Sequence, residues 1–160
     1  MRSWLHSLVA RDNSLVGIEL RSADARDQNW LFNLHELAHR ELAEAAYGPW
    51  IEAEQLIFIR ELVEEFETFV VVVENRDVGA VYLGERDGDT WLELIEVDPA
   101  CQGAGIGASV LHWVVGVSAG RGCGTLLQVH RLNEGALRLY EREGFMRVGQ
   151  TATHHILRHA

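Results

Sequence analysis

The sequence predicts a single α/β domain with a mixed, mostly antiparallel central sheet flanked by helices. The chain has 160 residues, which suits one domain. Its middle carries closely spaced segments with strand patterning, and helical periodicity occurs both before and after them. The expected element order is βααβββαβαββ, without an internal repeat. One domain is therefore expected over residues 1–160, with residues 1–15 as an N-terminal extension.

The first part of the chain predicts one strand and two helices. Residues 17–21 alternate in polarity, as expected for a short strand. Apolar residues then recur at helical spacing between residues 30 and 42, and Gly48-Pro49 ends that helix. A second helix has an acidic side, expected to face water, and an apolar stripe formed by Leu56, Ile59, Leu62, Val63 and Phe66.

The rest of the chain predicts most of the sheet. Strands are expected at residues 69–74, 78–83 and 90–97, separated by turns at residues 75–77 and 87–89. A helix at residues 105–119, a strand at 125–129 and a helix at 133–143 follow. Strands at residues 145–148 and 151–157 close the sheet, which gives the domain its mixed, mostly antiparallel character.

The composition narrows the classes of partner. The net charge is −10, so the chain is a poor candidate for binding nucleic acid or an anionic membrane surface, and cationic partners such as amines are favoured. No apolar run approaches the ~20 residues of a membrane span. Cys101 and Cys123 have neither a zinc spacing nor a disulfide framework, which indicates reduced thiols and a cytoplasmic protein.

Three alternating glycines, Gly103, Gly105 and Gly107, lie between a predicted strand and a predicted helix. Glycines let backbone N–H groups approach a ligand closely, and a helix start adds unpaired donors and a positive dipole end. The pattern therefore predicts a pyrophosphate-binding loop. Gly103, Gly105 and Ala108 also fit the dinucleotide fingerprint G-x-G-x-x-A, but the next strand leads to His130 where that fingerprint needs an acid.

Two motifs carry a resemblance to a known family. Gln102-x-x-Gly105-x-Gly107 matches the Q/R-x-x-G-x-G/A signature of the GNAT superfamily, and Val97-Asp98-Pro99 stands where that family usually carries V-x-P. The family's block N-x-x-A-x-x-x-Y-x-x-x-G-F is similar to the run that contains Asn133, Ala136, Tyr140, Gly144 and Phe145. The element order also matches, so the resemblance covers nearly the whole chain.

The resemblance implies an acetyl-coenzyme A-dependent N-acetyltransferase that acetylates a primary amine in a ternary complex. In this family the strand before the glycine loop bulges and splays from the next strand, and the backbone around Ile95, Glu96 and Val97 would pair with pantetheine there. Many members dimerise, so a homodimer is also expected. The cofactor-binding residues implied in this way are Ile95, Val97, Gln102, Gly103, Ala104, Gly105, Ile106, Gly107, Ala108 and Asn133.

One position departs from the family pattern. Many relatives carry Arg or Lys directly after the glutamine, where this chain has Gly103. The cofactor phosphates would then lose a charge-assisted hydrogen bond, and Arg131 or Arg138 would be the remaining cationic candidates. We therefore expect weaker or more salt-sensitive cofactor binding.

The resemblance assigns Tyr140 as the general acid that protonates the coenzyme A thiolate. Helical spacing places Asn133 and Tyr140 on one helix face, two turns apart. A base is also needed because a free alkylamine is mostly protonated at neutral pH. Glu93 and Glu96 are candidates on opposite faces of the third meander strand, with Glu93 preferred unless a bulge reverses the alternation. Gln128 stands where relatives that acetylate ribosomal-protein N-termini carry a glutamate, which argues against that role.

Two other functions remain open at this point. His35-Glu36-x-x-His39 is a literal H-E-x-x-H on a predicted helix, the pattern of zinc-dependent hydrolases, although Leu42 occupies the glycine position of the extended form. We expect these histidines to be ordinary surface residues, or else to contact the amine from the wall of an acceptor site. The second alternative is a domain of the same fold that binds acyl-coenzyme A without catalysis.

Overall fold

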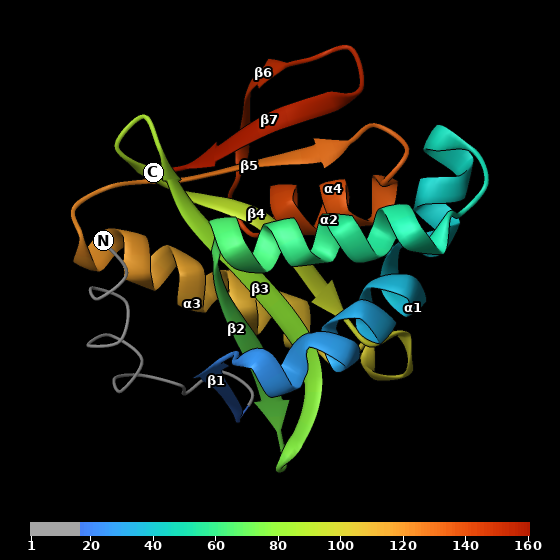
Figure 1. The fold of residues 1–160 in the computed structure, drawn as a ribbon. Helices are drawn as coiled ribbons and strands as arrows, with labels where there is room; N and C mark the ends of the chain where they lie inside the picture. Colours follow the sequence, from blue (N-terminus) through green and yellow to red (C-terminus); the bar gives the residue numbers. More distant parts are fainter. Residues whose placement is uncertain (1–16) are drawn as a thin grey trace.

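A computed structural model describes residues 17–160, so the predicted extension at residues 1–15 lies outside the described residues. Seven strands form one sheet in the order β1-β2-β3-β4-β5-β7-β6 (Figure 1). Every neighbouring pair is antiparallel except β4 and β5. The strands are β1 (Ile18–Ser22), β2 (Glu67–Val73), β3 (Arg76–Arg86), β4 (Asp89–Val97), β5 (Thr125–His130), β6 (Met146–Gln150) and β7 (His154–His159).

Four α-helices cover the two faces of this sheet. Helices α1 (Gln28–Tyr47) and α2 (Glu52–Glu65) lie in front of it in Figure 1, and α3 (Ile106–Gly120) and α4 (Glu134–Arg142) lie behind. Short 3-10 turns, η1 (Ala25–Asp27) and η2 (Pro99–Cys101), precede α1 and follow β4. None of the helices within residues 17–160 has the length and apolar character needed to cross a membrane. The predicted α/β fold, with its mixed and mostly antiparallel sheet, is confirmed.

Each face of the sheet has its own hydrophobic core. Behind the sheet, α3 contributes a mostly apolar buried face that includes Val110, Leu111 and Val114, each with 0% of its surface exposed. In front, Leu31 and Leu34 of α1 pack with residues of α2 and with Ala80 and Tyr82 of β3. The apolar residues of α1 recur every three or four positions, so they form one face of the helix, and this face packs on the sheet.

The chain differs from the sequence prediction at several element ends. Glu74, expected to end a strand, and Asn75 form the turn instead, with positive φ angles of 49° and 62°. Leu56, expected in the buried stripe of α2, is instead 41% exposed. β7 begins at His154 rather than at residue 151, and η2 was not expected.

Salt bridges fix where α1 begins relative to the sheet. Both guanidinium nitrogens at the end of Arg21, in β1, donate to the Asp27 carboxylate, over 2.9 and 2.8 Å. Asp27 also accepts from the Asp24 backbone N–H, and Asp24 in turn accepts from that of Arg26. This reciprocal cap holds the start of α1 against β1, so the helix crosses the sheet in a defined direction.

Gly79 of β3 is the point where two strands approach too closely for a side chain. A Cβ placed there would lie 2.6 Å from the backbone oxygen of Glu96, in β4. We expect Gly79→Ala to destabilise the domain by about 1–3 kcal/mol, because a backbone atom cannot yield locally as a flexible side chain can. Urea unfolding would measure the loss. The control is Gly116→Ala on α3, which has open space around its Cβ and should gain up to about 1 kcal/mol in helix propensity. Equal stability of the two variants would contradict the close approach.

Candidate active site

β4 and β5 separate from one another at one end of the sheet. They pair in parallel only through Thr90, Trp91 and Leu92 of β4, facing Thr125, Leu126 and Leu127 of β5. β4 continues to Val97 against β3, but its register with β3 shifts at Glu93, which is the extra residue of a β-bulge. The later part of β4 therefore has no paired residue on β5, and the bulged, splayed strand expected from the resemblance is present.

The glycine loop follows directly and opens α3. Gly103 and Gly105 have φ angles of +83° and +80°, a region that side chains with a Cβ disfavour. No side chain caps the helix, and the first bond across the turn runs from the Ser109 N–H to the Gly105 oxygen over 3.0 Å. The N–H groups at the start of α3, those of Ile106, Gly107 and Ala108, thus lack an intrahelical partner and suit an anion such as a pyrophosphate.

The side chain of Gln102, the glutamine of the signature, forms a hydrogen bond within the protein. The Gln102 side chain donates to the backbone oxygen of Val97 over 3.2 Å, and the Asp98 carboxylate accepts from the Ala100 N–H over 2.9 Å. These bonds fix the loop to the end of β4. They place the glycine loop next to the open part of β4, so that one extended ligand could contact both.

The two arginines considered for the phosphates make other contacts. Arg131 donates to the Gln150 side chain and to the Thr151 backbone oxygen, over 3.2 and 3.0 Å. Arg138 lies 3.9 Å from Glu134, one helical turn away. In this arrangement the glycine loop offers backbone donors to an anion, and weaker or more salt-sensitive cofactor binding stays a prediction.

α4 places Asn133 and Tyr140. The Asn133 side-chain oxygen accepts from the Ala136 N–H over 3.3 Å and so caps the helix, while its NH₂ group is left available to a ligand. Tyr140 is buried, with its ring centre 5.9 Å from that of Phe145. Burial raises the pKa of Tyr140 to about 12, so its hydroxyl keeps its proton at neutral pH.

On the other face of the sheet, Glu96 forms a buried cluster with α1 and α2. The His35 Nδ1 lies 2.9 Å from the Glu96 Oε2, and the His35 Nε2 lies 2.9 Å from the Gln55 Oε1. The His39 ring stacks on that of His35, 5.2 Å between centres and 19° from parallel. The expectation of an ordinary surface residue is wrong for His35, whose side chain is 1% exposed, while His39 is 30% exposed and also lies near Glu96.

The histidines titrate in opposite directions. Burial would lower the pKa of His35, but the hydrogen bond and charge of Glu96, with the Gln55 contact, raise it above its ordinary value. Burial lowers the pKa of His39, helped by the nearby His35 and His130, and the charge of Glu96 offsets this only in part. His35, whose two ring nitrogens face acceptors, is therefore the more readily protonated ring, and His39 is the less readily protonated one.

Several buried polar atoms of this region have no hydrogen-bond partner among the described residues. They are the Trp50 Nε1, the Tyr82 hydroxyl and the Glu96 Oε1. Burial, followed by the charge of Glu96, raises the pKa of Tyr82. Unsatisfied buried groups are costly and concentrate at functional sites, which sets this cluster apart from the two apolar cores.

Glu93 and Glu96 have different environments. Glu93 is half-buried and accepts a hydrogen bond from the Trp91 Nε1 of its own strand. Glu96 is 3% exposed and contacts α1. The preference for Glu93 in the sequence rested on strict alternation along the strand, and the bulge at Glu93 breaks that alternation.

The H-E-x-x-H pattern is not arranged as a metal site. Both ring nitrogens of His35 already face other side chains, and the two imidazoles stack instead of converging on one point. Glu36 lies on the other side of the helix, where it bonds Arg40 over 2.9 Å. Over residues 17–160, no three His, Cys, Asp or Glu side chains are grouped as metal ligands.

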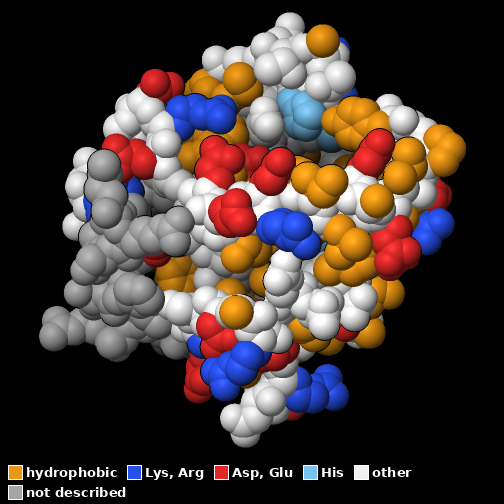
Figure 2. Space-filling view, in the orientation of Figure 1, with side chains coloured by type: hydrophobic (Ala, Val, Ile, Leu, Met, Phe, Trp, Pro, Cys, Tyr) orange, Lys and Arg blue, Asp and Glu red, His pale blue; other side chains and the backbone are white. Residues whose placement is uncertain are grey.

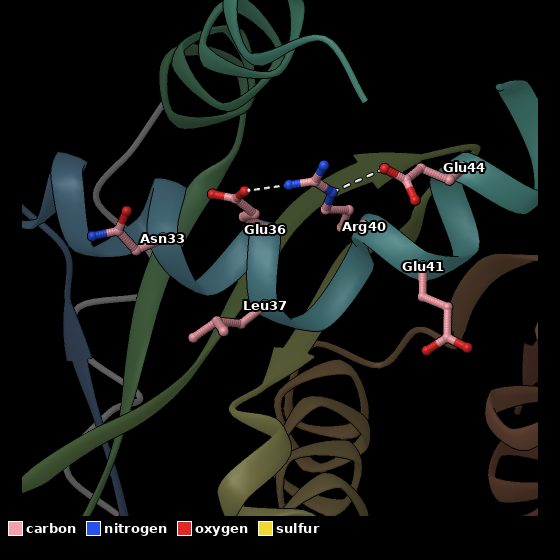
Figure 3. A pocket seen from close by; sticks show the side chains of 6 residues that line it. All are labelled: Asn33, Glu36, Leu37, Arg40, Glu41 and Glu44. Carbon is pink, nitrogen blue, oxygen red and sulfur yellow. Dashed lines mark hydrogen bonds and ion pairs between the residues drawn. The ribbon is translucent and has the colours of Figure 1, made fainter. Parts of the chain in front are cut away.

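A hollow of about 640 Å³ lies on the outer side of α1, away from this cluster (Figure 3). Five of the six residues that line it are polar or charged, the sixth is Leu37, and Arg40 spans the hollow with bonds to Glu36 and Glu44. About 100° of rotation per residue places this lining opposite His35 and His39. Apart from Glu36 of the H-E-x-x-H pattern, the hollow thus contains none of the residues considered for catalysis.

The surface of the protein near the α1–α2 connection is apolar. Figure 2 shows hydrophobic side chains gathered on this part of the surface, with acidic side chains spread over the neighbouring face. The Tyr47 ring meets that of His130 edge to face, 5.6 Å between centres, and His130 in turn contacts His154. The large exposed apolar residues in the connection and the start of α2 are Tyr47, Ile51, Leu56, Ile57 and Phe58.

Sequence reasoning did not identify several members of the cluster. Trp50 and Phe58 pack on the His35 ring at 5.4 and 5.3 Å, and Gln55 holds its second nitrogen. The one available signal was the acid inside an apolar strand, since such a residue needs a partner. That partner is 61 positions away in the sequence, so only the fold reveals it.

Comparisons with known proteins agree with this geometry. A family model described as the acetyltransferase (GNAT) family matches residues 33–145, more than half of the chain. The fold is similar to PaiA N-acetyltransferase from Thermoplasma acidophilum in complex with coenzyme A, with 18% identity, 88% of this chain and 97% of that chain covered, and a TM-score of 0.73. No match was found among curated proteins.

Two further solved structures share the fold. An acetyltransferase from Thermus thermophilus has 18% identity over 91% of this chain and 97% of that chain, with a TM-score of 0.72. The ribosomal-protein-S18-alanine N-acetyltransferase from Escherichia coli has 21% identity over 88% and 90%, with a TM-score of 0.64. At these identities the likeness concerns the fold.

Proposed function

The chain belongs to the acetyltransferase (GNAT) family, and on that premise we propose that it transfers the acetyl group of acetyl-coenzyme A to a primary amine within a ternary complex. The observation that carries the amine acceptor is the buried Glu96–His35–His39 cluster beside the open part of β4. A primary alkylamine must lose a proton before it can attack, because its pKa is about 10. A carboxylate and a neutral imidazole at the end of the splayed strand supply the groups for that task.

The same residues fit the acyl donor. The first-turn N–H groups of α3 and the left-handed Gly103 and Gly105 would hold the pyrophosphate, with Ala104 between them. The backbone of Ile95 and Val97 would pair with pantetheine where β5 has diverged, and the free NH₂ of Asn133 would contact the same arm. The bound thioester supplies the activated acetyl carbonyl. Gln102 would contribute by fixing the loop.

Two side chains are proposed to serve the proton transfers of the reaction, Tyr140 directly and Glu96 through the histidines that it contacts. Tyr140, protonated at neutral pH, would donate to the leaving thiolate. Glu96 is preferred over Glu93 for the amine side, because Glu96 contacts both histidines whereas Glu93 is bonded to Trp91. The domain that carries these residues would be the whole chain, and a homodimer remains an expectation from the family.

Free-thiol release from acetyl-coenzyme A, measured with a panel of amines and basic peptides, tests this proposal. Chelator-treated and untreated enzyme are compared in parallel. Turnover that is insensitive to chelation would support the transferase and name its acceptor class. Chelator-sensitive hydrolysis would instead favour a metal-dependent enzyme, and tight acetyl-coenzyme A binding without turnover would favour a binding domain.

Gly105→Ala tests the glycine loop separately. At its φ of +80° an alanine costs about 1–2 kcal/mol, so the loop should change conformation and the Kd for coenzyme A should rise roughly tenfold. Isothermal titration calorimetry measures this. Gly120→Ala, at the end of the same helix and with no atom near its Cβ, is the control and should bind as the wild type does. Unchanged affinity of Gly105→Ala would contradict the proposed pyrophosphate site.

A further inference from the structure

α1 connects the ends of the two strands that separate. His35 and His39 are four residues apart and share one face of this helix, and Tyr47 lies two turns after His39. His35 is bonded to Glu96 of β4, while the Tyr47 ring contacts His130, the last residue of β5. His39 lies between these two anchors. The helix therefore holds the His39 ring across the opening between β4 and β5.

His39 is also the accessible member of the cluster. The side chains of His35 and Glu96 are 1% and 2% exposed, whereas that of His39 is 30% exposed. An amine that enters from solvent can reach the His39 ring without unpacking α1. Glu96 lies on the inner side of that ring. The distance from the Glu96 Oε2 to the His39 Nδ1 is 3.9 Å.

Resting on the proposed function, we propose that His39 is the catalytic base that takes the proton from the acceptor amine, and that His35 and Glu96 are positioning residues for its ring. Burial lowers the pKa of His39, so the ring is neutral and able to accept a proton at pH 7. The titratable groups that face it are Glu96 from β4, His35 from α1 and His130 from β5. α2 contributes the neutral Gln55 amide, and Tyr82 of β3 faces Glu96.

The proton balance is complete with these residues. The ammonium loses one proton to His39, and the nitrogen lone pair then forms a C–N bond to the acetyl carbonyl as the C–S bond breaks. Tyr140 gives its proton to the thiolate, and the second proton lost by nitrogen passes through water to the Tyr140 phenolate. His39 releases its own proton to water, helped by the stacked His35 ring, which lowers the pKa of His39, so one proton is released for each acetyl group transferred.

The first experiment follows the histidine rings by NMR in the whole protein, with coenzyme A as the probe. We expect His39 to titrate below its ordinary pKa of 6.5 and His35 above it. Coenzyme A should shift the His39 ring signals together with the amides of residues 103–108. A His39 ring that titrates above 6.5, or that does not respond when the loop amides do, would overturn the proposal.

The second experiment uses His39→Gln, with thiol release measured from pH 6 to pH 10. Its kcat/KM should fall about 10²–10⁴-fold at pH 7, and the deficit should shrink towards pH 10 as the amine loses its proton unaided. His112→Gln on α3, which removes an exposed histidine paired with Glu143, is the matched control and should keep the wild-type profile. A deficit of constant size at every pH would assign His39 a structural role.

The two proposals fail in distinguishable ways. If no amine in the panel releases thiol with the wild-type enzyme, the proposed function is contradicted, and the NMR titration still decides whether His39 lies at the donor site. If the wild type turns over and His39→Gln equals it at pH 7, the proposed function stands and His39 is excluded as the base.

Discussion

Replacing Tyr140 with phenylalanine should lower kcat about 10²–10⁴-fold while the Kd for acetyl-coenzyme A stays within roughly twofold of the wild type. The substitution removes only the hydroxyl, whose raised pKa of about 12 keeps it protonated and able to donate. The ring still packs on Phe145, so the fold should be retained. Single-turnover thiol release and equilibrium titration measure the two quantities separately.

Tyr47→Phe is the control for this comparison. It also deletes a tyrosine hydroxyl, but from a residue that is 68% exposed and whose ring contact with His130 needs no hydroxyl. Its kcat should be close to that of the wild type. A Tyr140→Phe variant with full turnover would remove Tyr140 as the general acid and leave solvent to protonate the thiolate.

The largest effect on stability is expected for Glu96→Ala. The change leaves the buried His35 without its carboxylate, and breaking a buried pair in this way costs about 3–5 kcal/mol. Urea unfolding at pH 6 measures the difference. Glu96→Gln, which keeps the shape and one hydrogen-bond acceptor, should lose less. Glu61→Ala on the exposed side of α2 is the control and should change stability by at most about 0.5 kcal/mol.

The pH dependence of this loss has a defined sign. The folded-state pKa of His35 is raised, so its charged form adds stability below the ordinary value of 6.5, and that contribution disappears as the pH rises through the raised value. The cost of Glu96→Ala should therefore be larger at pH 6 than at pH 9. A cost that is independent of pH would mean that Glu96 and His35 do not form an ion pair.

Most of the fold could be predicted from the sequence because local patterns determine it. The apolar periodicity of residues 30–42, the stop at Gly48-Pro49 and the closely spaced strands all act over a few residues, and each expected element is present. The errors lie at element ends. Glu74 was expected to continue a strand, but the turn needs two residues with positive φ, and nothing in the apolar pattern locates that turn.

The candidate site divides in the same way. The glycine loop is contiguous in sequence, so its backbone geometry follows from the residues themselves. The Glu96 cluster depends on contacts across 61 positions, and on a bulge that sets which side Glu93 and Glu96 take. Helical spacing put His35 and His39 on one face, but whether that face met water or the sheet depended on how α1 crosses the strands.

The short parallel joint between β4 and β5 also affects how cooperatively the domain unfolds. Three residue pairs join the antiparallel unit β1–β4 to the antiparallel unit β5–β7, so this seam is where sub-global opening is expected to begin. A ligand that binds β4 and the start of α3 only in the folded domain stabilises that domain in proportion to the logarithm of its concentration. The supply of acyl donor would thus raise the stability of the folded enzyme as well as its rate.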